Sequence, residues 1–66
     1  MSVAKICELT AESSKSFEAA IQKGISKMSK TVDNIEGAWI KDQKVVVKDG
    51  EISASRVTMK VTFIVK

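Results

Sequence analysis

The chain has 66 residues, a net charge of +3, one cysteine and no histidine. A single domain of this length, residues 1–66, buries only about 60% of its unfolded surface, so it needs a further stabilising element. One cysteine excludes an intrachain disulfide, and Cys7 without a histidine excludes a Cys/His zinc site. Association with further copies of the chain is the stabilising element that remains.

The charge and the N-terminus exclude further classes of protein. The lysines are spread along the whole chain, so its basic balance predicts a solvated mixed-charge surface rather than a nucleic-acid site. Residues 1–5 contain no long apolar run, which predicts neither a signal peptide nor a membrane segment. With one unpaired cysteine, these features predict a cytoplasmic protein without a membrane partner.

The first predicted element is a strand over residues 3–9. Its alternation of apolar and polar residues is imperfect, so both of its faces are expected to be partly covered. Cys7 lies on this strand and is expected to be buried, since no histidine is present to activate it as a nucleophile. The polar residues 10–14 predict a turn, in which Ser13 or Ser14 caps the following helix.

An amphipathic helix is the next predicted element. Apolar residues recur at spacings of three and four, which places them on one stripe of the helix. They are Phe17, Ala20, Ile21, Gly24, Ile25, Met28 and Val32. Gly24 on this stripe predicts a close approach of the helix to a sheet, because a glycine there costs about 1 kcal/mol relative to alanine. Asp33-Asn34 is expected to end the helix, with Asn34 in the left-handed conformation.

A long extended segment follows over residues 35–48. Successive side chains of a strand point to opposite faces. The odd-numbered residues of this segment, among them Gly37 and Trp39, are therefore expected on one face and the even-numbered residues on the other. The segment is more than twice as long as the usual strand of about 5–6 residues. It is therefore expected to bend, with Gly37 as the candidate position, or to project toward a neighbouring subunit. Asp49-Gly50 then predicts a tight hairpin turn.

The strongest strand signal lies at the C-terminal end of the chain. Apolar residues occupy every odd position from 57 to 65 and alternate with a more polar row. That row consists of Arg56, Thr58, Lys60, Thr62 and Ile64. The predicted fold is α+β with the order β-α-β-β: a three-stranded antiparallel sheet packed on one helix. Its uncovered face and free strand edges predict a closed homo-oligomer.

Three segments of the chain resemble the dodecin family. They are SFEAAIQ at 16–22, TVDNI at 31–35 and VTMKVTF at 57–63, and their order and the length of the chain match that family as well. The resemblance implies a hollow homododecamer that stores a flavin (riboflavin, FMN or FAD) at its subunit junctions and is not an enzyme. An alternative stays open: a structural shell without flavin that holds ions or an anionic metabolite such as coenzyme A.

Two positions carry the flavin site in flavin-binding dodecins. A tryptophan after the helix stacks on the ring, and a glutamine at the start of the last strand bonds its polar edge. These positions correspond to Gly37 and Arg56 here. Glycine cannot stack on a ring, and arginine has donors but no acceptor. Trp39 lies on the same predicted face as Gly37, roughly 7 Å further along the strand. It either stacks a ligand in a shifted pose or fills a gap between subunits.

The candidate ligand-binding residues are therefore Gly37, Trp39, Arg56 and Thr58. The polar row of the last strand either contacts a phosphate of FMN, FAD or coenzyme A or forms a solvated, salt-bridged surface. No catalytic constellation is present. No metal site is assigned; Glu36 and Asp42 are candidates to meet around an ion on a symmetry axis, and Asp49-Gly50-Glu51 lacks the ligands of a calcium loop.

Overall fold

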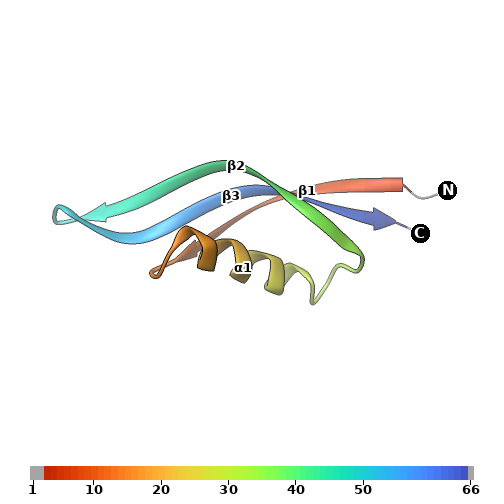
Figure 1. The fold of residues 1–66 in the computed structure, drawn as a ribbon, viewed down its shortest axis with the longest axis horizontal. Helices are drawn as coiled ribbons and strands as arrows, with labels where there is room; N and C mark the ends of the chain where they lie inside the picture. The colour runs from red at the N-terminus through yellow and green to blue at the C-terminus, as the bar shows by residue number, and fades with distance from the viewer. Residues whose placement is uncertain (1–2, 66) are drawn as a thin grey trace.

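The computed structural model describes residues 3–65 as a strand, a helix and two further strands. The elements are β1 (Val3–Ser13), α1 (Phe17–Met28), β2 (Ile35–Lys48) and β3 (Glu51–Val65). The sheet is antiparallel with β3 in its centre and β1 and β2 at its edges. The helix α1 covers the middle of one face (Figure 1), and within residues 3–65 no element covers the other. The predicted β-α-β-β fold is confirmed.

Strand β1 is longer than predicted. It continues to Ser13 and pairs with β3 along its whole length, so the turn expected over residues 10–14 was wrong for most of its extent. The polar residues are accommodated because β3 is long enough to hydrogen-bond them, and because their side chains lie at an exposed edge. Cross-strand pairing therefore decided a segment whose composition favours a turn.

The helix begins with a different cap from those predicted. Ser16 is the N-cap, and its Oγ accepts a hydrogen bond from the Ala19 N–H at 3.0 Å. Ser13 instead accepts from the Lys15 N–H at 3.0 Å, which stabilises the turn between strand and helix. The prediction of Ser13 or Ser14 as the cap was wrong, because β1 uses residues up to Ser13 and the turn needs those that follow.

The helix ends at Met28, several residues before the predicted end at Asp33-Asn34. The Ser29 hydroxyl donates to the Ser26 carbonyl at 2.8 Å, and the Thr31 hydroxyl donates to the Met28 carbonyl at 3.2 Å. Hydroxyls that bond to the last carbonyls of a helix compete with its continuation. Asn34 is left-handed as expected, with φ 62°, but it lies beyond the helix, at the entry to β2.

The core is small and lies between α1 and the centre of the sheet. Its fully buried residues are Ala20, Val57, Met59 and Val61. A Cβ added at Gly24 would lie 3.0 Å from Leu9 Cδ1 and 3.1 Å from Ala11 Cβ, so the predicted close approach of the helix is confirmed. Cys7 is exposed rather than buried, because α1 packs against β1 only further along, at Leu9 and Ala11.

Strand β2 is irregular. Its pairing with β3 skips one residue at Glu36 and one at Lys41. A bulge adds one residue to one strand and moves the residues beyond it to the opposite face. The prediction that the odd-numbered residues of 35–48 share a face was therefore wrong. Gln43, for example, lies opposite the buried Val57 on the helix side of the sheet.

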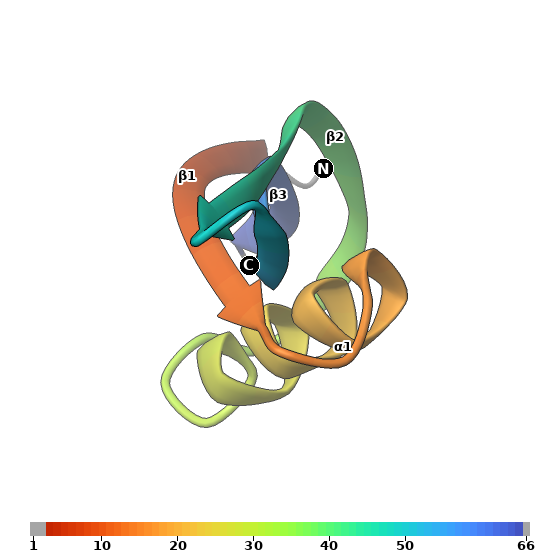
Figure 2. The ribbon, with the colours of Figure 1, turned by 90° about the vertical axis from the view of Figure 1, so that its left-hand side faces the viewer.

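The single chain is elongated rather than compact. Its extents are 51 × 20 × 13 Å and its radius of gyration is 13.5 Å, whereas a compact chain of this length has a radius of about 11 Å. The β2–β3 hairpin continues beyond the N-terminal end of α1 (Figures 1 and 2). Large apolar side chains stay exposed along this shape, among them Val3, Ile6, Trp39, Val47 and Ile52. Both features indicate surfaces that a partner covers. No helix within residues 3–65 is long and apolar enough to span a membrane.

Candidate functional site

The uncovered face of the sheet carries the four candidate ligand-binding residues. Residues directly opposite each other in an antiparallel pair point to the same face. Gly37 lies opposite Thr62, and Trp39 lies opposite Lys60. Gly37 and Trp39 keep a common face, as predicted, because they lie between the two bulges of β2. The alternation of β3 places Thr58 and Arg56 on this face as well.

Trp39 is the dominant feature of this face. Its side chain is 73% exposed, which leaves the indole ring free for a ligand or for a second chain. Trp39, Lys41 and Lys60 contribute to a shallow pocket of about 160 Å³. An aromatic ring flanked by ammonium groups suits a flat aromatic ligand that carries negative charge.

The neighbourhood of Gly37 is open. A Cβ at this position would meet no atom within 4 Å, so a larger side chain fits there in the single chain. The backbone of Gly37 does not have a positive φ, and glycine is therefore not required for its conformation. The position that the dodecin resemblance assigns to a stacking tryptophan is thus open rather than filled by another residue.

Arg56 is already engaged within the chain. Its Nη2 and Nε donate to the same Glu12 carboxylate oxygen, at 2.8 and 2.9 Å. Glu12 lies opposite Arg56 on β1. Of the two interpretations offered for the polar row, the salt-bridged surface is the one that Arg56 adopts in the single chain. A ligand would have to displace Glu12 or use the remaining N–H donors of the guanidinium group.

The structure separates the candidates into two places. Trp39 stands in the row of Lys60, whereas Arg56 lies four residues further along β3, roughly 13 Å away at the rise of a strand. Thr58 lies between these rows, and its hydroxyl shares a hydrogen bond with Thr10 at 3.1 Å. Within one chain, Arg56 and Trp39 do not converge on a common point.

Two charged residues near Trp39 had not been singled out from the sequence. Lys60 was only one member of the polar row, and Lys41 follows Trp39 by two residues, at the second bulge of β2. The Lys41 ammonium group lies 3.3 Å from the Glu8 carboxylate on the far edge strand, which leaves Lys60 as the less engaged cation. The position of Lys60 beside Trp39 follows from the cross-strand register, which the pattern within either strand does not report.

The acidic residues between positions 3 and 65 form no metal site in a single chain. Within residues 3–65, no group of three or more histidine, cysteine or acidic side chains lies close enough to hold an ion. Glu36 stands at the first bulge of β2, and Asp42 lies opposite Thr58. The Asp49-Gly50 pair forms the predicted hairpin turn, with φ angles of 52° and 76°.

Comparison with known proteins gives one family. The Dodecin family model matches residues 3–66. The chain belongs to the dodecin family. Among solved structures, this dodecin is similar to the dodecin from Streptomyces davaonensis, with 26% identity, coverage of 98% of this chain and 96% of that chain, and a TM-score of 0.93. No curated protein matches the chain.

Two more distant structures share the fold. A single-residue variant of the Thermus thermophilus dodecin is 24% identical, covers 100% of this chain and 98% of that chain, and has a TM-score of 0.94. The calcium dodecin of Mycobacterium tuberculosis, described as a calcium-chelating antigen, is 23% identical. It covers 97% of this chain and 91% of that chain, with a TM-score of 0.85. A protein with this fold is therefore described as chelating calcium.

Proposed function

We propose that this dodecin forms a homododecamer and binds a flavin (riboflavin, FMN or FAD) at its subunit junctions, as a store and not as an enzyme. One observation carries the proposal: Trp39 is 73% exposed on the uncovered sheet face, directly opposite Lys60. The isoalloxazine ring is flat and aromatic, and stacking on an indole buries it from water. The ammonium group of Lys60 offers a partner for the phosphate of FMN or FAD.

The uncovered face supports a site between chains. A single exposed indole can cover only one side of a ring, and the other side needs a second surface. The elongated chain and its exposed apolar side chains require such a surface for their own burial. A junction between two copies would supply both, and closed symmetry would repeat it around the assembly.

The proposal is tested by titrating riboflavin, FMN and FAD separately with the purified protein. We expect saturable quenching of flavin fluorescence, because stacking on an indole quenches the excited ring. Native mass spectrometry on the same sample is expected to show a twelve-chain mass with flavin bound. Full flavin fluorescence at a protein concentration above that of the flavin would contradict flavin binding, and a 7.2 kDa species would contradict the assembly.

A second candidate function is a shell without flavin that holds ions or an anionic metabolite such as coenzyme A. The Arg56–Glu12 ion pair favours it, because Arg56 is engaged where a flavin-binding dodecin has a glutamine. A cation site would need carboxylates from several copies, with Asp42 and Glu36 as candidates. Here we expect colourless protein whose thermal midpoint rises with Ca²⁺ or coenzyme A and not with FMN.

We also propose a reducing, cytoplasmic location. Cys7 is exposed and is a free thiol, and an exposed thiol persists in the reduced form mainly in reducing compartments. Quantifying free thiols in protein taken directly from cells under alkylating conditions tests this: one alkylated thiol per chain is expected, and a disulfide-linked dimer would contradict it.

A further inference from the structure

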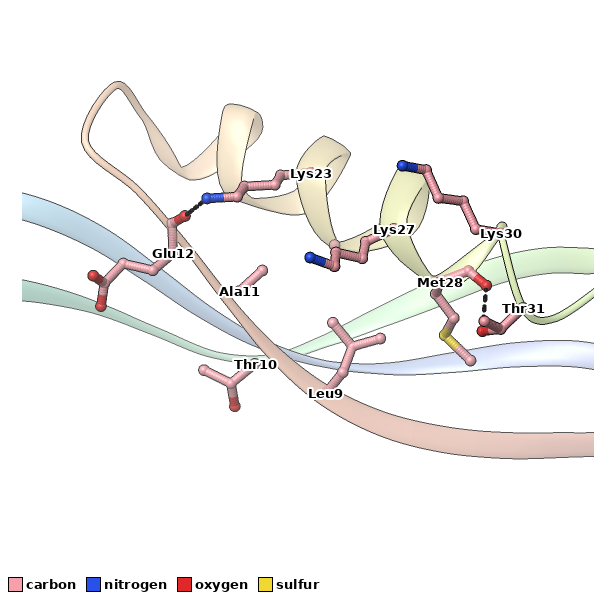
Figure 3. Close-up of a pocket in the computed structure, with 10 residues that line it drawn as sticks. Leu9, Thr10, Ala11, Glu12, Lys23, Lys27, Met28, Lys30 and Thr31 are labelled. Carbon is pink, nitrogen blue, oxygen red and sulfur yellow. Dashed lines mark hydrogen bonds between the residues drawn. The ribbon is translucent and has the colours of Figure 1, made fainter.

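A second concave surface lies between α1 and the edge strand β1, away from Trp39. This α1–β1 groove has a volume of about 610 Å³. Its floor is apolar and consists of Leu9, Ala11, Gly24 and Met28, and its rim carries Lys23, Lys27 and Lys30. Figure 3 shows Leu9 and Met28 between the helix and the strand, with the lysines extending from the helix side. Its size is that of a binding groove rather than of a packing defect.

The rim of the groove has positive charge that no carboxylate between residues 3 and 65 fully neutralises. Lys23 donates to the Glu12 backbone carbonyl at 3.3 Å. Neither Lys27 nor Lys30 forms an ion pair with any residue between 3 and 65. The one carboxylate that lines the groove, Glu12, is held by Arg56 on the other side of the strand. An occupant of this groove should therefore combine apolar surface with negative charge.

The tip of the β2–β3 hairpin has those properties. Val47 and Ile52 lie opposite each other, so their side chains form one apolar pair, and they are 59% and 68% exposed. Asp49 and Glu51 lie between Val47 and Ile52 along the chain, outnumber the single Lys48 of the tip, and form no ion pair within the described part of the chain. The tip extends beyond the N-terminal end of its own helix (Figures 1 and 2), so it is presented to another molecule.

We propose that the hairpin tip of one copy, residues 47–52, docks into the α1–β1 groove of a second copy. Val47 and Ile52 cover the apolar floor, and the carboxylates of Asp49 and Glu51 meet Lys27 and Lys30. The inference rests on the homo-oligomer proposed above and names the surfaces that join its copies. Each copy gives a tip and receives one, which is a head-to-tail contact that closes into a ring when the rotation between copies closes.

Lysine acetylation of the intact wild-type assembly tests the contact without any substitution. The rate at each lysine is measured by peptide mass spectrometry and divided by its rate in denatured protein. We expect Lys27 to be protected about tenfold or more relative to the exposed Lys15. A docked carboxylate shields the amine of Lys27 and favours its protonated form, which does not react. Equal reactivity of Lys27 and Lys15 in the assembly overturns the proposal. Protection that appears only on adding inorganic pyrophosphate also overturns it and assigns the groove to a small anion.

Charge reversal supplies the second measurement. Lys27→Glu and Glu51→Lys are each expected to lower the fraction of assembled protein in native mass spectra about tenfold, and the double variant is expected to restore it. Lys15→Glu changes the same charge outside the groove and should assemble as the wild type does. A double variant no better than either single variant overturns the contact. A monomeric wild type would overturn the assembly itself, whereas an assembly without flavin binding leaves both measurements intact.

Discussion

Trp39 on β2 lies directly opposite Lys60 on β3, and both side chains lie on the sheet face that no element of residues 3–65 covers. The pair offers one ligand both an aromatic surface and a cation. It differs from the flavin site expected for a dodecin, because the indole is displaced from Gly37 by two residues and Arg56 is engaged by Glu12. Substitutions at Trp39, Lys60, Gly37 and Arg56 separate the contributions of these positions.

Removing the indole should abolish most flavin binding. Trp39→Ala is expected to raise the Kd for FMN roughly 5- to 150-fold, because stacking of a ring on an aromatic side chain is worth about 1–3 kcal/mol. Trp39→Phe should retain part of the affinity. Val3→Ala is the control, since Val3 is a similarly exposed apolar residue of an edge strand, at 60% exposure, and lies opposite Val65 on the helix side of the sheet. If the Trp39→Ala variant quenched flavin fluorescence as strongly as the wild type, the indole would have no role in flavin binding and would be assigned to packing between subunits.

Lys60 should distinguish phosphorylated from unphosphorylated flavins. Lys60→Met keeps much of the side-chain length and removes the charge. It is therefore expected to raise the Kd for FMN about fivefold or more and to change the Kd for riboflavin little. Raised salt should reduce the wild-type preference for FMN, because an exposed ion pair is screened. The control is Lys5→Met, which lies opposite Phe63 on the helix side of the sheet. Equal losses for both flavins would exclude a phosphate contact at Lys60.

Restoring the two residues of flavin-binding dodecins should strengthen flavin binding. Gly37→Trp has room in the single chain, because a Cβ there meets no atom within 4 Å. Arg56→Gln adds an acceptor, and loss of the exposed Arg56–Glu12 pair is expected to cost at most about 1 kcal/mol of stability. We expect the double variant to bind riboflavin at least tenfold more tightly than the wild type in a fluorescence titration. A higher Kd for riboflavin in an intact assembly would mean that other residues of the assembly block the flavin position.

Gly24 is expected to resist even a small enlargement. Gly24→Ala places a Cβ 3.1 Å from Ala11 Cβ, which is rigid, and 3.0 Å from the Leu9 and Met59 side-chain ends. Overpacking of about 1–3 kcal/mol should outweigh the helix propensity gain of up to about 1 kcal/mol. Urea unfolding at fixed protein concentration measures the net loss. Gly37→Ala, where the new Cβ meets nothing, should change the midpoint little, and equal midpoints for both variants would contradict the close approach.

Local pattern determined several features of this protein. Strict alternation from Val57 to Val65 predicted which side chains of β3 face the core, because a strand has a period of two. Asp49-Gly50 predicted a turn with two positive φ angles, because these residue types tolerate that conformation. The apolar stripe of the helix, with Gly24 at the closest approach, followed from the period of 3.6 residues in the same way.

Contacts between distant segments decided the rest. The bulges at Glu36 and Lys41 depend on how β2 pairs with β3, and no periodicity within residues 35–48 reports them. The engagement of Arg56 by Glu12 joins residues 44 positions apart. The α1–β1 groove exists only because β1 forms an edge of the sheet beside the helix. Residue spacing within one segment reports whether that segment has the period of a helix or of a strand. Register and strand order depend instead on which pairing of distant segments buries more surface and satisfies more backbone groups.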